Sequence, residues 1–215
     1  MQILFAIFLA ICPLGWAEGA EEISEMERQA RVGEVERLSG EIRTLGRRQI
    51  WAGVERKYNQ LLKVEIPAGG DVHLIAAYSA RERGDLLEVH TRLIRAATDN
   101  PTEVVIDWLY DLDHNFGRVE LKADRRRTAV LEASSMPLDP NRRKAVEAAI
   151  KECSDHGKFT GLLPRGKYRF GGQDFAVEPG ISVRVEVSPK ARRQGMNKPT
   201  IVYHELPQAT VKEKE

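Results

Sequence analysis

The sequence predicts an α+β protein, with antiparallel helix pairs in its N-terminal half and a small antiparallel β-sandwich in its C-terminal half. Between residues 18 and 115, apolar residues recur every three or four positions, which is the spacing of one helix face. From residue 116 to residue 188 they mostly alternate with polar residues, as in half-buried strands. Hydrophobic residues make up 42% of the chain, which is enough for a buried core and too many for a wholly disordered chain.

The N-terminus has the pattern of a secretory signal peptide over residues 1–17. Residues 3–16 read ILFAIFLAICPLGW, a short apolar run that is followed at once by acidic sequence. Gly15 and Ala17 are small residues at the two positions that a signal peptidase reads. We therefore expect cleavage after Ala17 and a protein in the periplasm or outside the cell. The run lacks the usual positive charge at its start, and a hydrophobic helix that packs on the body is the alternative.

The chain has only two cysteines, Cys12 and Cys153, so cleavage would leave one thiol and no internal disulfide. Residues 9–12, LAIC, resemble a lipobox, the signal for lipid attachment to a cysteine, although Ile11 stands where that pattern has a small residue. A lipid anchor at Cys12, with association with the outer membrane, is therefore an alternative to cleavage. Once the signal is removed, we expect no transmembrane span, because such a helix needs roughly 20 apolar residues.

Five helices are predicted in the acidic first half. Ser24 and Glu27 have the spacing of a capping box, which indicates the start of the first helix. Four of the five helices show an apolar stripe, and a stripe of this kind predicts the face that packs inward. The stripes are Val35, Leu38, Ile42 and Leu45; Trp51, Val54, Tyr58, Leu61 and Leu62; Leu86, Val89, His90, Leu93 and Ala97; and Val104, Val105, Trp108, Leu109 and Leu112.

Turn residues separate these helices. Proline and two glycines in residues 67–70 stop the second helix, because proline lacks a donor and glycine frees the backbone. Asp71 is predicted to cap a third helix that runs to about Arg83, and Gly84 then turns the chain. Residues 100–101, Asn-Pro, are predicted to begin the fifth helix, with proline in its first turn.

Residues 73–101 resemble a tetratricopeptide repeat. Counted from the turn at Gly84, the matching small or apolar residues and the closing proline are Val89, Leu93, Ala96 and Pro101. The first half departs from the pattern, since His73, Ala76, Ala77 and Ala80 stand where a large aromatic residue, a leucine, a glycine and a tyrosine are usual. The resemblance implies a short array of stacked helix pairs whose concave face binds a partner. A plain helical bundle is the alternative.

The spacing of the apolar residues changes in residues 116–188. Residues 118–122 alternate as a strand, residues 124–127 predict a turn and residues 128–132 a returning strand. A helix is predicted over residues 141–154, with Cys153 on its apolar face as a small buried hydrophobe. Further strands are predicted at 161–164, 167–170, 174–177 and 181–187, with a hairpin turn at residues 171–172. The basic tail, residues 189–215, holds one more predicted strand at 200–204, which could pair with a sheet edge.

This second half resembles the small β-sandwich modules of the PEGA type, which occur in bacterial envelope proteins. The matching residues are the opening strand at 117–122, the string LPRGKY at 163–168 and the closing strand that ends at Val187. The Pro-Glu-Gly-Ala string that names the family is absent, and the helix at 141–154 is an insertion relative to it. The resemblance implies non-catalytic binding or spacing, often beside helical repeats.

Charge divides the chain into three pieces. Residues 18–116 carry 13 basic and 19 acidic residues, residues 117–188 carry 14 and 10, and residues 189–215 carry 6 and 3. This asymmetry suggests two bodies and a tail that attract each other. Two basic clusters could bind peptidoglycan or another polyanion: Arg125, Arg126 and Arg127, and Arg142, Arg143 and Lys144. Aromatic residues are not interleaved with them, so nucleic-acid binding is not expected.

No catalytic signature and no cofactor motif stands out. Asp111, Asp113 and His114 offer three metal-type ligands close together, so a metal-dependent enzyme is one alternative. The favoured interpretation is an acidic helix end that runs into a loop and holds no metal.

Taken together, these patterns predict an exported, non-catalytic binding or scaffolding protein of the bacterial cell envelope. We expect it to recognise a protein partner through the groove of its helical repeats, with cell-wall binding through the basic β half as the alternative. The residues predicted to contact the partner are Tyr78, Arg81, Arg83 and His90.

Overall fold

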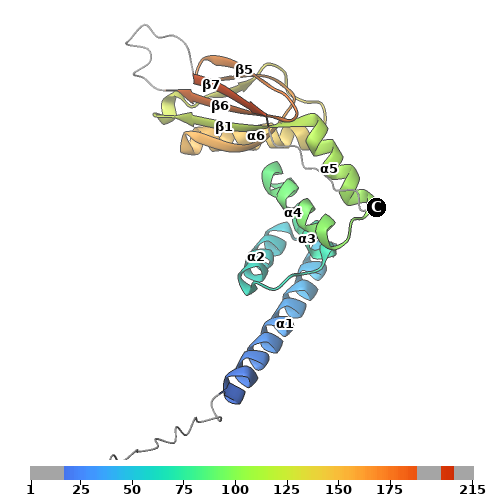
Figure 1. Cartoon of the computed structure of the whole chain (residues 1–215). Coiled ribbons are helices and arrows are strands. Elements are labelled where there is room, and N and C mark those ends of the chain that lie inside the picture. The colour runs from blue at the N-terminus through green and yellow to red at the C-terminus, as the bar shows by residue number, and fades with distance from the viewer. Residues whose placement is uncertain (1–16, 188–199, 206–215) are drawn as a thin grey trace, which may run out of the picture.

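A computed structural model describes residues 17–187 and 200–205, and it shows the predicted α+β class (Figure 1). Five helices precede the strands, and the long first helix extends away from the body. They are α1 (Ala17–Arg47), α2 (Trp51–Leu61), α3 (Gly70–Glu82), α4 (Leu86–Asp99) and α5 (Glu103–Asn115), with the short 3-10 helix η1 (Leu62–Val64) after α2. The predicted signal peptide, except Ala17, and the alternative anchor at Cys12 lie outside the described residues. Within those residues, none of the helices combines the length and apolarity of a membrane span.

Each helix of the first half packs against the next one along the chain. The predicted stripe of α1 is buried, since Val35, Leu38 and Ile42 expose 8% or less of their surface. These three side chains share one core with Val54, Tyr58 and Leu61 of α2 and with Val72 and Ala76 of α3. The periodicity of the sequence therefore identified the faces along which α1 and α2 meet, whereas no stripe was predicted for α3.

Three predicted helix starts differ from the structure. α1 begins at Ala17, so Ser24 lies inside the helix, because the alanine and glutamates before it continue the helix readily. The N-cap of α3 is Gly69, and Asp71 in its first turn instead accepts two hydrogen bonds from Arg43, at 2.6 and 3.0 Å. Asn100 ends α4, because its N–H donates to the carbonyl of Ala96, and α5 starts only after Thr102.

The second half forms two sheets around α6 (Pro140–His156). One sheet has the strand order β3-β1-β6-β7 and the other β2-β4-β5. The strands are β1 (Phe116–Ala123), β2 (Leu131–Ala133), β3 (Lys158–Pro164), β4 (Gly166–Phe170), β5 (Gln173–Val177), β6 (Ile181–Val187) and β7 (Thr200–Glu205), and the 3-10 helix η2 (Arg126–Thr128) precedes β2. Both sheets and α6 bury their apolar residues, including Cys153, in one core.

Two features of strand pairing differ from the expectation, and two confirm it. β1 runs parallel to β6, so the larger sheet is mixed. β2 pairs with β4, not β1, because β3 and β6 already occupy the two edges of β1. The hairpin at Gly171 and Gly172 forms as predicted, with both φ angles positive, at 58° and 84°. The last predicted strand forms β7, which pairs antiparallel with β6.

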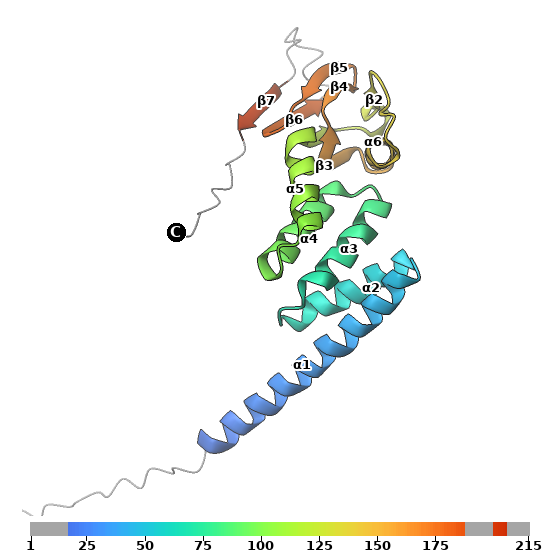
Figure 2. The same ribbon diagram turned by 90° about the vertical axis from the view of Figure 1, so that its right-hand side faces the viewer.

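The helical half rests directly on the β half (Figure 2). A third apolar core joins residues of α3, α4 and α5 to Phe116 of β1 and Ala145 of α6. The turn between α3 and α4 approaches α6 closely, since a Cβ at Gly84 would lie 2.8 Å from the carbonyl oxygen of Lys144. The ion pair between Lys144 and Glu82, at 2.8 Å, also crosses this junction. The junction between the two halves thus combines an apolar core with an ion pair between the acidic helical half and the basic β half.

Candidate binding groove

A groove of about 510 Å³ lies where α3, α5 and α6 meet, beside the start of β1. Helix α3 contributes Tyr78 and Arg81 to it, and α5 contributes Asp107 and Trp108. Arg142 comes from α6 and closes the side towards the β half. The groove therefore depends on the packing of the two halves, because neither half alone supplies its walls.

Arg81 is held in the groove by two aromatic rings. Its guanidinium carbon lies 4.9 Å from the centroid of the Tyr78 ring and 5.1 Å from that of Trp108, and the two ring centroids are 5.0 Å apart. Within the described residues Arg81 forms no ion pair, and its Nε makes no hydrogen bond. Cation–π contacts orient a guanidinium without neutralising its charge. Arg81 therefore brings a positive charge without an ion pair among the described residues to an aromatic surface, while Asp107, Asp111 and Asp139 also line the groove.

The wall formed by α6 is fixed by its own contacts. Nη2 of Arg142 donates to Oδ1 of Asp111 at 3.1 Å, and the Arg142 guanidinium carbon lies 5.6 Å from the ring centroid of Phe116. Asp139 caps α6, since its Oδ1 accepts from the backbone N–H of Arg142 at 2.8 Å. Asp111 also accepts from Nδ2 of Asn115 at 2.7 Å. The cation of this wall is therefore already paired.

The four residues predicted to contact a partner do not form one site. Tyr78 and Arg81 are three positions apart on α3 and share the groove. Arg83 points to another face and pairs with Glu55 of α2 at 3.2 Å. His90 lies on α4, where its Nε2 is 3.1 Å from Oδ1 of Asp113. The first two remain candidates for recognition, while the other two have partners within the chain.

The six basic residues predicted to bind polyanions are also divided. Arg142 and Lys144 are paired with Asp111 and Glu82 of the helical half, so they join the two halves. Nε of Arg143 donates to the carbonyl of Pro137 at 3.3 Å. Arg125 and Arg126 are exposed on the segment that enters η2. The side chain of Arg127 lies outside the described residues.

The residues of the metal alternative have separate partners. Asp111 binds Arg142 of α6, Asp113 binds His90 of α4, and Nδ1 of His114 is 2.9 Å from the carbonyl of Tyr110. Over residues 17–187 and 200–205, side chains of the types that bind metals do not gather into groups of three or more. The short spacing in the sequence therefore does not bring these three side chains to one point.

Cys153 has the environment of a structural thiol. Its side chain is fully buried, and burial, with a smaller contribution from Glu152, raises the pKa of the thiol to about 12. A thiol with that pKa is protonated at neutral pH and is a poor nucleophile. The interpretation of Cys153 as a small core residue agrees with this environment.

Sequence reasoning missed two parts of this architecture. Trp108 was placed on an apolar stripe, but its contact with Arg81 was not predicted, because Tyr78 and Trp108 lie on different helices. Arg92 was not singled out, yet it exposes only 1% of its surface and binds Glu55 of α2. The only local signal was its position between Val89 and Leu93, on the face that packs inward.

Comparisons of the chain with protein-family models, with curated proteins and with solved structures found no match. The resemblances to tetratricopeptide repeats and to PEGA modules therefore stay predictions. The geometry of the groove and the N-terminal sequence are the two features that point to a binding function.

Proposed function

We propose that this chain is a non-catalytic binding protein of the bacterial cell envelope that takes an extended segment of a protein partner in the groove between α3, α5 and α6. The observation that carries the proposal is the position of Arg81, clamped by Tyr78 and Trp108 and without a carboxylate partner in the described residues. Arginine and large aromatic residues are the types that dominate binding energy at protein interfaces.

The groove suggests what it would recognise. Tyr78 and Trp108 offer aromatic surface to an apolar side chain, and Arg81 offers its charge to an acidic residue beside it. Asp107 is exposed at the rim and would disfavour a second acidic group there. The walls are helices packed on a common core, so the groove is formed before binding and little order has to be created.

The compartment follows from the N-terminal sequence. The apolar run at residues 3–16, with small residues at 15 and 17, supports export and a mature chain that begins at Glu18. Lipid attachment at Cys12 is the other route to the envelope. Either route places the groove where it meets proteins of the periplasm, the cell surface or the outer membrane.

Co-purification from gently solubilised envelopes tests this proposal. The chain carries a C-terminal tag, and mass spectrometry identifies both its own N-terminus and any bound protein. A chain that begins at Glu18 and a stoichiometric partner are the expected results. A chain that keeps Met1 and stays in the cytosol would contradict the compartment, and the absence of any stoichiometric partner would contradict the binding function.

Two variants show whether the groove makes the contact. Arg81→Gln replaces the guanidinium with a shorter, neutral amide, and it is expected to reduce recovery of the partner at least roughly tenfold, as loss of an interface arginine does. Arg83→Gln is the matched control, because it changes the same residue type at the C-cap of the same helix, outside the groove. Equal recovery with both variants would place the contact elsewhere.

A second candidate is binding of the cell wall or another polyanion by the β half. It is favoured by the exposure of Arg125 and Arg126, which form no ion pair within the described residues. Binding to isolated peptidoglycan that weakens steeply with salt and is lost in a variant with both arginines changed to Gln would support it. Binding that does not change with salt would exclude it.

A further inference from the structure

The first part of α1 extends beyond the helices that it packs on, although Ala30 and Arg31 line a pocket with Lys63 and Val64 of η1. Every side chain in residues 24–33 is exposed, and Figure 1 shows this part of the helix extending away from the body. We call residues 17–33 of α1 the arm. Met26 on the arm exposes 65% of its surface. Helices in proteins are stabilised mainly by packing one face, and residues 24–33 bury none of their side chains, so a second helix on the arm would supply the missing contacts.

A second groove lies at the other end of the same helix. It has a volume of about 790 Å³ and runs between α1 and α2. Its lining includes Gly40 and Thr44 of α1, Gly53 of α2, and Ile50, which is 45% exposed. We call this the α1–α2 groove. Its small residues leave room for a helix backbone to approach closely.

The arm and the α1–α2 groove lie on one face of α1. Met26, Gly33 and Gly40 are spaced seven residues apart, so they follow one another along a single stripe of the helix. The stripe is separate from Val35, Leu38 and Ile42, which face the core. A Cβ placed at Gly33 or at Gly40 would meet nothing within 4 Å. Two glycines inside a helix cost stability, and no contact within the described chain explains them.

These positions match when two copies of α1 lie antiparallel and cross at Gly33. Residues whose numbers are equally far from Gly33 then face each other across a two-fold axis, so Met26 of one copy lies over Gly40 of the second copy. The arm of each copy thereby enters the α1–α2 groove of the other. The crossing point falls on a residue without a side chain, which allows the two helices to come close.

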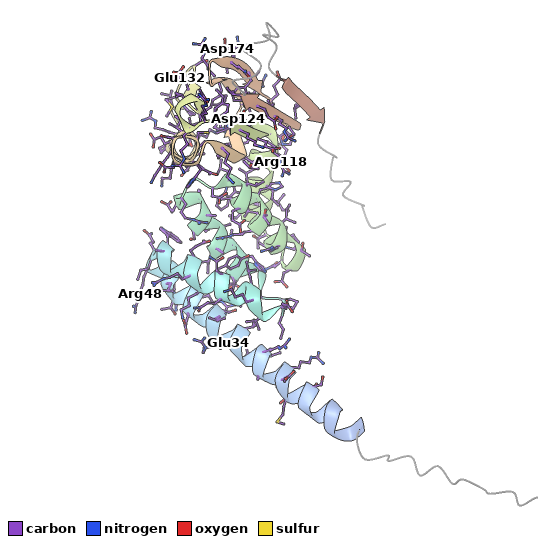
Figure 3. The ribbon with its side chains drawn as sticks, turned by 90° about the vertical axis from the view of Figure 1, so that its left-hand side faces the viewer. Glu34, Arg48, Arg118, Asp124, Glu132 and Asp174 are labelled. Carbon is purple, nitrogen blue, oxygen red and sulfur yellow. The ribbon has the colours of Figure 1, made fainter. Side chains whose placement is uncertain are left out.

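The charges along α1 favour the same antiparallel arrangement. Residues 18–27 contain five glutamates and no basic residue. The other end of α1 carries Arg47 and Arg48, both exposed and without an ion pair within the described residues, and Arg56 lines the α1–α2 groove nearby. Figure 3 shows Arg48 at the end of α1 near α2 and Glu34 further along the helix, towards the arm. An antiparallel pair brings the acidic end of each helix to the basic end of the other.

We propose that two copies of this chain form a symmetric dimer in which the arm of each copy occupies the α1–α2 groove of the other. The dimer is isologous, since the same surface is used twice. The groove at Arg81 is not part of this interface, because the residues that line the two grooves are different.

Sedimentation equilibrium of the full chain, as the cell processes it, tests the dimer over a range of concentrations. Met26→Lys removes the apolar side chain and adds a charge that the basic groove repels, and we expect the dissociation constant to rise at least roughly tenfold. Val32→Lys is the matched control, because Val32 is also exposed on the arm but lies about 100° around the helix from Gly33. We expect it to change the dissociation constant by less than about threefold.

Cross-linking tests the register. Gly33→Cys places the two introduced thiols at the crossing point, where an oxidant is expected to join them into a covalent dimer. Val32→Cys is expected not to cross-link, and the native Cys153 is buried. A chain that is monomeric at every concentration would overturn the proposal. A dimer that fails to cross-link at position 33, or that is unaffected by Met26→Lys, would also overturn it, because another surface would then hold the copies together.

Discussion

Arg92 of α4 and Glu55 of α2 form a bidentate ion pair inside the helical half, with both N–O distances at 2.8 Å. Arg92 also donates to the carbonyl of Ala76 at 2.8 Å, and its guanidinium carbon lies 4.5 Å from the ring centroid of Tyr58. Burial opposes the charge on Glu55, but the hydrogen bonds and charge of Arg92 keep the pKa of that carboxyl below its usual value. One buried cation thus links three consecutive helices.

Removing Glu55 is expected to destabilise the fold strongly. Glu55→Ala leaves the guanidinium of Arg92 buried without its main partner, which costs about 3–5 kcal/mol of unfolding free energy when a buried pair is broken. Glu88→Ala is the control, because Glu88 contacts the same guanidinium at 3.0 Å but its side chain is 35% exposed. Its loss should cost less than about 1 kcal/mol. Urea unfolding measures both, and equal losses would show that the Glu55 pair is no stronger than a surface one.

Gly84 is expected to be essential for packing the helices on α6. Its φ is +77°, and an added Cβ would lie 2.8 Å from both the Cβ of Ala148 and the carbonyl oxygen of Lys144. Gly180→Ala is the control, since Gly180 also has a positive φ, +72°, but open space around it. The control should lose about 1 kcal/mol from backbone strain alone. Gly84→Ala should lose roughly 1–3 kcal/mol more from the clash, which thermal unfolding would detect. Equal losses would argue against the close approach.

Acid is expected to weaken the helical half through His73. Nη1 of Arg95 donates to Oη of Tyr58 at 3.2 Å, which leaves the Tyr58 hydroxyl to donate to Nδ1 of His73, 2.9 Å away. Burial, followed by the charge of Arg95, lowers the pKa of His73, so the folded state resists protonation of the ring. The unfolded state takes up that proton first, and stability therefore falls as the pH drops below about 6.5.

The loss can reach at most about 1.4 kcal/mol per pH unit for one group. Urea unfolding at about pH 7.5 and pH 5.5 should show it in the natural chain, and His73→Gln should show a smaller difference between the two values. The comparison isolates His73, because every other titrating group is common to both proteins. An unchanged difference would mean that His73 is not the group that responds.

The thiol of Cys153 is expected to be unreactive in the folded protein. With a pKa of about 12, only about one molecule in ten thousand carries the thiolate at pH 8. Alkylation followed by mass spectrometry of the peptide that contains Cys153 should find no label without denaturant and full label in guanidinium. Fast labelling of the folded chain would show that the face of α6 that carries Cys153 is exposed to solvent.

Because folding keeps the thiol of Cys153 protonated, the stability of the fold should also decline as the pH rises above about 9.

The helical faces could be predicted because they depend on local spacing. Val35, Leu38 and Ile42 recur at the period of the helix, and any fold that forms this helix must cover that stripe. The burial of Arg92 could not be predicted in this way, because an arginine on an apolar face is tolerated only when a distant residue pairs with it. Its partner Glu55 is 37 positions away, and no local pattern reports that separation.

For the strands too, local features could be predicted and long-range pairing could not. Alternation predicted where β4, β5 and β6 lie, and two adjacent glycines predicted the hairpin at residues 171–172. The parallel pairing of β1 with β6 could not be predicted, because the two strands are separated by α6 and four other strands. Which edge of a strand is occupied depends on all strands of the sheet together.

The groove was the feature that the sequence predicted least well. Tyr78 and Arg81 were chosen from their place on one helix, but Trp108 and Arg142 complete the site from two other helices. The sequence by itself determined the order of helices and strands, the inward faces of α1, α2 and α4 and the burial of Cys153, because periodicity and turn residues act locally. Only the tertiary structure decided which of the predicted cations remain free, since a carboxylate that neutralises a cation can come from any part of the chain. Arg142 and Lys144 form ion pairs with Asp111 and Glu82 across the junction between the two halves, whereas Arg81 lies against two aromatic rings.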